Sequence, residues 1–231
     1  MPQKPTISKT ASLEALRTAE AWVFDLDNTL YAPSSRIFDQ IDERICSYIA
    51  EFLELDRDEA YRIQKLYFRE HGTSMRGLMD LHDMDPGPFL DHVHDIDLTG
   101  IPSNPALNRA LGAIPARKVI FTNADRRHAQ RITDRIGVSH HFEGVYDIID
   151  SSYVPKPARK VYDDMIRVFD LDPKKTVMVE DMARNLKPAA EMGMATVWVQ
   201  NDTPWGVEGA EDGCVHHVAH ELAAWIESVF P

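Results

Sequence analysis

The chain has 231 residues, of which 44% are hydrophobic and 27% are charged, and its formal net charge is −12. This composition is typical of a globular protein with one large domain, or with one domain that carries an insertion. Nucleic-acid backbones and anionic membranes bind clusters of Lys and Arg, which this acidic chain lacks, so both are excluded as partners.

Cysteine use and hydropathy bear on the cellular compartment. Cys46 and Cys214 lie far apart in the sequence and form no CxxC motif, as expected in a reducing compartment. Residues 1–20 lack the apolar stretch of a signal peptide, and no stretch approaches the roughly 20 apolar residues of a membrane span. We therefore expect a soluble cytoplasmic protein.

The first elements in chain order are a short helix around residues 13–19 and a strand at 21–24. The strand is predicted because the apolar run AWVF stops abruptly at the acidic loop DLDN, a pattern typical of a buried strand. A long helix follows, since apolar residues recur every four positions and form one stripe. These residues are Ile37, Ile41, Ile45, Ile49 and Leu53.

The rest of the first half is also predicted to be mainly helical. Asp56 resembles the first residue of a capping box and begins a second helix, which ends near Gly72. Residues 77–97 are rich in His, Asp and Pro, and we expect loops joined by a short helix at 87–93. The Asn-Pro pair at 104–105 is typical of the start of another helix.

After residue 113 strands alternate with helices, which predicts an α/β fold with a parallel sheet. The predicted strands are 118–121, 145–149, 176–179, 195–199 and 215–218, and the predicted helices are 124–136, 158–169 and 183–192. The sequence therefore predicts an α/β core built from residues 1–31 and 114–231, interrupted after its first strand by a helical insertion at 32–113.

Polar residues follow the predicted strands at the edge where a parallel sheet binds ligands. Asp25 and Asp27 follow the first strand, and such a pair can supply a nucleophile for phosphorus and an acid for the leaving group. Thr122 and Asn123 follow the second strand and can hold phosphate oxygens with a hydroxyl and a backbone N–H. The ordinary alternatives are a turn rich in Asp and Asn, and a threonine that caps the next helix.

Two further clusters complete the edge. Lys156 lies between two prolines, where a stiff loop can hold its charge against a phosphoryl group. Glu180 and Asp181 follow another strand, with Asn185 close behind, and adjacent acids there suit Mg²⁺. A solvated lysine and an acidic helix N-terminus are the ordinary alternatives. We favour a functional role for these residues over the ordinary alternatives because all four clusters are predicted to converge on one edge of the sheet.

These residues resemble the four motifs of the haloacid dehalogenase superfamily. The matching segments are 24–31 (FDLDNTLY), 121–124 (FTNA), 156–157 (KP) and 180–181 (ED) with Asn185. Within the superfamily the chain is similar to the pyrimidine 5′-nucleotidase branch. That similarity depends on Leu30-Tyr31 and, in the insertion, on Gly72-Thr73 with Gly77-Leu78, His82 with Asp85-Pro86, and Val93-His94-Asp95.

The resemblance implies a Rossmann-like core with a helical cap, and a role for each site residue. Asp25 attacks phosphorus and becomes an aspartyl-phosphate, while Asp27 protonates the leaving oxygen and later activates water. Mg²⁺ binds the Asp25 carboxylate, the Asp27 backbone carbonyl and Asp181. Thr122, Asn123 and Lys156 hold the phosphoryl oxygens, and Glu180 and Asn185 support the metal site. We also expect neighbouring carboxylates to raise the pKa of Asp27 and keep it protonated.

The resemblance further implies a small phosphorylated metabolite as substrate, by preference a pyrimidine nucleoside 5′-monophosphate. Flavin mononucleotide, phosphoglycolate and sugar phosphates are alternatives, and a phosphomutase is a less favoured one. Dehalogenases lack the second Asp, so Asp27 disfavours dehalogenation. Candidates for selectivity in the cap are Tyr67, His71, Thr73, Arg76, His82, His94 and Asp95; of these His71, Arg76 and His82 are the main prediction.

Two other classes of protein are less consistent with the sequence. Receiver domains also form an aspartyl-phosphate beside Mg²⁺, but their phosphoacceptor comes mid-chain and they lack a long insertion after the first strand. A catalytically inactive scaffold is disfavoured because every motif position holds a competent residue. The sequence predicts no particular oligomeric state.

Overall fold

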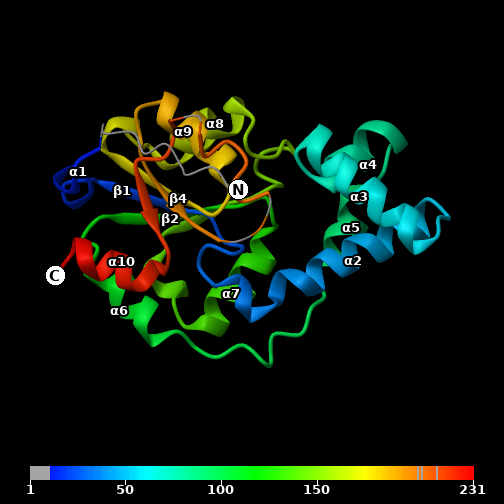
Figure 1. Cartoon of the computed structure of the whole chain (residues 1–231), viewed down its shortest axis with the longest axis horizontal. Helices are drawn as coiled ribbons and strands as arrows, with labels where there is room; N and C mark the ends of the chain where they lie inside the picture. The colour runs from blue at the N-terminus through cyan, green and yellow to red at the C-terminus, as the bar shows by residue number, and fades with distance from the viewer. Residues whose placement is uncertain (1–10, 202, 204, 212) are drawn as a thin grey trace.

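The computed structural model describes residues 11–201, 203, 205–211 and 213–231. Its centre is a six-stranded parallel sheet in the order β3-β2-β1-β4-β5-β6 (Figure 1). The strands are β1 (Ala21–Phe24), β2 (Arg117–Phe121), β3 (Gly144–Tyr146), β4 (Thr176–Glu180), β5 (Ala195–Val199) and β6 (His217–Ala219). The α/β fold predicted from the alternating pattern is therefore confirmed, with β3 and β6 shorter than the predicted strands.

Helices cover both faces of the sheet (Figure 1). They are α1 (Leu13–Arg17), α6 (Pro105–Ala113), α7 (Arg126–Ile136), α8 (Arg159–Phe169), α9 (Ala183–Glu191) and α10 (Leu222–Val229), with 3-10 turns η1 (Pro33–Ser35), η2 (Ser139–His141) and η3 (Pro173–Lys175). Alternate strand residues point to opposite faces. Trp22 and Phe24 pack in the apolar cluster of α6, α7 and α10, whereas Val23 packs in that of α8 and α9.

Helices α2 (Ile37–Phe52), α3 (Arg57–His71), α4 (Ser74–His82) and α5 (Pro86–Val93) form a separate group beside the sheet (Figure 1). They enclose an apolar cluster of their own, which includes Ile49, Leu78 and Phe89. As predicted, Asp56 caps α3, accepting from Glu59 N at 2.9 Å, and Gly72 ends it with φ +85°.

Helix α4 corrects the expected loop at 77–82. Thr73 caps this helix by accepting from Arg76 N at 3.1 Å. Gly77 weakens helix propensity in the sequence, but a Cβ at this position would lie 2.5 Å from Tyr67 of α3. The glycine therefore permits close packing of the two helices, and tertiary contact stabilises a helix that propensity does not favour.

Helix α6 lies with the sheet rather than with the group α2–α5. Leu107, Ala110 and Leu111 pack in the same cluster as Trp22 and Phe24. Helix α5 is the last helix in the chain whose residues belong to the cluster of Ile49, Leu78 and Phe89. Among the described residues, no helix combines the length and hydropathy needed to span a bilayer.

Candidate active site

The predicted site residues of the core meet at the carboxyl ends of three neighbouring strands. Phe24, the last residue of β1, pairs in register with Ile120 of β2 and Val179 of β4. The residues that follow these strands therefore emerge side by side, as expected for a parallel sheet. Asp25, Asp27, Thr122, Asn123, Lys156, Glu180, Asp181 and Asn185 all line one cavity at this edge.

Lys156 joins the strand ends through its ammonium group. Its Nζ donates to Asp25 Oδ1 and to Glu180 Oε2, each at 2.7 Å, and to the backbone oxygen of Phe121 at 2.9 Å. The side chain is 1% exposed. Its two carboxylate partners outweigh the effect of burial and raise the pKa of Lys156. The lysine is therefore a fixed positive charge and not a solvated surface residue.

The acidic residues outnumber this single lysine. Asp25, Glu180 and Asp181 place carboxylate oxygens within 4.8 Å of one another, and all three are buried. Burial, and next the charge of Glu180, raise the pKa of Asp25 to about 7, and the same two causes raise the pKa of Asp181 well above its usual value. Buried carboxylates in such excess need further positive charge. Hard oxygen donors of this kind fit Mg²⁺.

Asp27 has a different environment from Asp25. Its Oδ1 accepts from Tyr31 Oη at 2.5 Å and lies 3.0 Å from Nε2 of His128, which donates because a carboxylate oxygen only accepts. Burial acts to raise the pKa of Asp27, but His128 and Tyr31 outweigh it and lower the pKa below its usual value. The predicted rise was wrong because the nearest groups are hydrogen-bond donors rather than other carboxylates.

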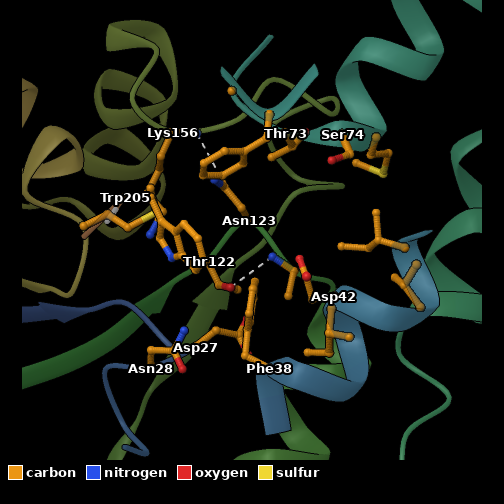
Figure 2. Close-up of a pocket in the computed structure, with 18 of the residues that line it drawn as sticks. Asp27, Asn28, Phe38, Asp42, Thr73, Ser74, Thr122, Asn123, Lys156 and Trp205 are labelled. Atoms are coloured by element: carbon orange, nitrogen blue, oxygen red, sulfur yellow. Dashed lines mark hydrogen bonds between the residues drawn. The ribbon is translucent and has the colours of Figure 1, made fainter. Parts of the chain in front are cut away.

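The predicted phosphate-binding residues also make contacts that order the loops around them. Thr122 Oγ1 accepts from the backbone N of Ala124 at 3.0 Å, and Asn123 Oδ1 accepts from the backbone N of Lys156 at 2.8 Å. Thr122, Asn123 and Lys156 lie together on one side of the cavity in Figure 2. The residue that caps α7 is Asp125, so the alternative role of Thr122 as a helix cap does not apply.

The predicted supporting residues behave differently from each other. Glu180 receives the Lys156 ammonium, and its Oε1 accepts from the backbone N of Met182 at 3.3 Å. Asn185 lines the cavity, but its Oδ1 has no hydrogen-bond partner among the described residues. Asp181 is positioned by Asn201, whose Nδ2 donates to Asp181 Oδ2 at 3.0 Å, and by Trp198, whose Nε1 donates to its backbone oxygen at 2.8 Å.

The helical group α2–α5 contributes the other side of the cavity, where Phe38, Asp42, Thr73 and Ser74 are seen in Figure 2. Much of this side is apolar, and Trp205 adds an aromatic ring from the segment after β5. The cavity measures about 1180 Å³ when the part open to solvent is included.

Of the selectivity residues predicted in the insertion, Thr73 and His94 line the cavity, whereas the three main ones lie elsewhere. Among the described residues that line the cavity, none is His71, Arg76 or His82. His71 and Arg76 both pair with Asp80, and Tyr67 Oη lies 2.7 Å from Nε2 of His82. These contacts are internal to the helical group. The structure therefore brings the core motifs together but not these three residues.

Three residues near the acids were not predicted as part of the site: Tyr31, His128 and Asn201. One signal for His128 was available. It begins the buried stripe of α7, which continues through Ala129, Ile132 and Ile136. A histidine at an apolar position, just after a strand-end loop, indicates a buried polar partner.

A family model described as a haloacid dehalogenase-like hydrolase matches residues 19–193. The chain belongs to this family. The predicted superfamily is thereby confirmed, and the protein is a hydrolase of the haloacid dehalogenase-like type. The fold and the four strand-end clusters are those that the resemblance implied.

Comparisons with individual proteins agree on the fold. The chain is 25% identical over 195 residues to phosphate metabolism protein 8 of Saccharomyces cerevisiae, and the match covers 77% of this chain and 60% of the yeast protein's length. CbbY from Rhodobacter sphaeroides, solved with phosphate, superposes with a TM-score of 0.62 at 15% identity over 89% of this chain and 95% of its own. L-2-haloacid dehalogenase from Xanthobacter autotrophicus superposes with a TM-score of 0.57 at 14% identity. This match covers 91% of this chain and 98% of the dehalogenase.

Proposed function

We propose that this hydrolase is a magnesium-dependent phosphomonoesterase that forms an aspartyl-phosphate on Asp25. The observation that carries the proposal is Asp27, a second carboxylate beside Asp25 that lines the same cavity. An alkoxide leaving group needs a proton in the transition state, whereas a halide does not. Since structural neighbours with this fold include a dehalogenase, the fold alone does not distinguish the two reactions, and Asp27 favours the phosphatase.

The reaction begins with Asp25. A carboxylate oxygen of Asp25 attacks phosphorus in line, the bond to the leaving oxygen breaks, and that oxygen takes a proton from Asp27. Asp27 is a carboxylate in the free protein, and the negative charge of a bound phosphate ester raises its pKa so that it takes up this proton. Water then attacks the phosphoryl group, Asp27 accepts the water's proton, and orthophosphate leaves with the Asp25 carboxylate restored.

Fixed charges around the reacting group support this assignment. Lys156 neutralises the phosphoryl oxygens and keeps Asp25 oriented through the 2.7 Å contact. The residues that would hold Mg²⁺ are Asp25, Asp181 and the backbone carbonyl of Asp27, with Glu180 close to them. When bound, the ion supplies positive charge to the transferring phosphoryl group and to the acidic cluster.

We propose a pyrimidine nucleoside 5′-monophosphate as substrate, selected by a helical cap formed from the insertion at 32–113. Phe38 and Trp205 line the same cavity as Thr122 and Lys156, and their rings suit a planar base. The name of the yeast relative, phosphate metabolism protein 8, is consistent with a phosphorylated substrate but names no class of ester.

A phosphate-release assay over a panel of esters, with and without Mg²⁺, tests the proposal. The panel contains UMP, CMP, flavin mononucleotide, phosphoglycolate, ribose 5-phosphate and p-nitrophenyl phosphate. We expect magnesium-dependent release, fastest with UMP or CMP. Release from none of these esters contradicts the phosphatase, while a clear preference for another ester contradicts only the substrate class.

A further inference from the structure

The segment after α5 approaches the catalytic edge through two stacked histidines. His94 follows α5, and its ring stacks on His128 of α7 with centroids 4.3 Å apart and planes at 16°. His128 is fully buried and reaches Asp27 through Nε2. Only the ring of His128 thus separates His94, which follows the helical group α2–α5, from Asp27, the proposed acid.

Hydrogen bonds also fix His94, the residue of this stacked pair that lies farther from Asp27. His94 Nδ1 lies 2.8 Å from Asp125 Oδ2, and Asp125 Oδ1 accepts from the backbone N of His128 at 2.7 Å. Arg131 of α7 donates to the backbone oxygens of His94 at 2.6 Å and Ile96 at 2.9 Å. The first turns of α7 therefore hold both the His94 ring and the backbone that follows it.

The contacts at Asp27 leave one carboxylate oxygen available. Tyr31 and His128 both bond Oδ1, and among the described residues no protein donor bonds Oδ2. Holding one oxygen through two donors fixes the plane of the carboxylate, so that Oδ2 has a defined direction. His128 Nδ1 has no partner among the described residues, so the ring is oriented by Asp27 and by stacking on His94.

From this geometry we infer that His128 is a positioning residue that aims the free oxygen of Asp27 at the leaving group, and that His94 supports it by stacking. The inference depends on the proposed function, because it assigns the contact to the proton transfer made by Asp27. His128 itself touches neither substrate nor metal in this role. Its effect appears only in the step that needs the proton.

Two substrates separate this role from a structural one. The alcohol released from an alkyl phosphate needs a proton as it leaves, whereas p-nitrophenolate leaves with little assistance. The value of kcat/KM reports steps up to phosphoryl transfer to Asp25, so the later hydrolysis does not enter. We expect His128→Phe to lower kcat/KM on the order of 10- to 100-fold for UMP, or for the alkyl ester that the parent hydrolyses best, and less than about threefold for p-nitrophenyl phosphate.

The ratio of the two losses is measured on one preparation, so a reduced folded fraction cancels. His128→Gln, whose amide N–H takes the place of Nε2–H, restores most of the alkyl-ester activity. His141→Phe is the matched control, since His141 bonds Asn108 Oδ1 at 2.7 Å away from the site, and we expect both substrates unchanged.

The support from His94 is tested by a double-mutant cycle. His94→Ala lowers the alkyl-ester kcat/KM in the same selective way but by less, and adds nothing further in the His128→Phe background. Equal losses on both substrates in His128→Phe overturn the positioning role, and additive losses overturn the support from His94. A parent protein that releases no phosphate from any ester contradicts the proposed function instead.

Discussion

The two sides of the cavity differ in how their residues are held. On the core side, Asp25, Lys156 and Glu180 are buried charges with short contacts to one another. On the side of the helical group, Phe38, Met75 and Phe89 present apolar surface. Buried charges that are held at strand ends suit a single reaction. An apolar surface instead selects a leaving group by its shape and can accept different ones. Changes to these buried charges should therefore affect all substrates, and changes on the opposite side only some.

Among the changes that leave the nucleophile Asp25 in place, Lys156→Met should produce the largest effect. The substitution leaves Asp25 and Glu180 buried without their common partner, which costs about 3–5 kcal/mol of unfolding free energy in metal-free protein. We expect kcat to fall about 10²- to 10³-fold for every ester. Urea unfolding and the ester panel measure the two effects.

The control for this change is Lys175→Met, because Lys175 pairs with Glu20 at 2.8 Å on the surface. Surface pairs contribute little, so stability and turnover should stay near the parent values. If the loss of kcat in Lys156→Met differs strongly between esters, the proposed difference between the two sides of the cavity is contradicted.

Magnesium should stabilise the protein increasingly as pH rises. The pKa of Asp25 is raised from 3.8 to about 7, so between these values the folded metal-free chain keeps a proton that the unfolded chain loses. The contribution of Asp25 to the free energy of unfolding is therefore fully present below about pH 4 and is lost as pH rises toward 7. Since Mg²⁺ displaces that proton, its shift in Tm should grow from pH 5 to 8.

Calorimetry with Mg²⁺ and with EDTA at each pH measures this shift. Asp25→Asn removes one titrating group and should reduce the pH dependence, while Asp181, whose pKa is also raised, remains. A magnesium shift that is the same at pH 5 and pH 8 would contradict a metal site at these carboxylates.

Trp205→Ala should have a smaller effect that depends on the substrate. Its ring lines the cavity, with Lys65 Nζ 5.3 Å from the ring centroid. Loss of an aromatic contact of about 1 kcal/mol raises KM for UMP about fivefold. Ribose 5-phosphate, which has no base, should be unaffected, and steady-state kinetics on both esters decides the point. An equal rise for both would place Trp205 outside base recognition.

Arg76→Ala and His82→Ala should have the smallest effects. Their partners, Asp80 and Tyr67, belong to the same helical group. We expect kcat/KM to stay within about twofold for UMP, CMP and an aryl phosphate. A selective loss on the nucleotides would restore these residues to substrate recognition and show that the helical group rearranges around its ligand.

The core side of the cavity was largely predictable from the sequence, whereas the side formed by the helical group was not. The motif acids and Thr122 were predictable because they come at strand ends, and parallel strands end at one edge. Lys156 was predictable from its place between two prolines. Helix α4 was missed because Gly77 looks unfavourable until Tyr67 is seen packed against it. The low pKa of Asp27 was missed because His128 lies 101 residues away in sequence.

Most of the residues that face the cavity from α2–α5 were also not predictable, although Thr73 was among the candidates. Their direction depends on how four helices pack, which no motif records. The sequence pattern marked polar residues such as His71 and Arg76, but these residues pair with Asp80. Packing therefore decides which polar side chains remain available to a ligand.

The central claim is that Asp25 carries the phosphoryl group during turnover. Acid quenching of the protein during hydrolysis with Mg²⁺, followed by proteolysis and mass spectrometry, locates that group directly. We expect a phosphorylated peptide containing Asp25, absent from Asp25→Asn, whose turnover falls on the order of 10⁴-fold or more. A phosphoryl group on another residue, or undiminished turnover in Asp25→Asn, would contradict the account.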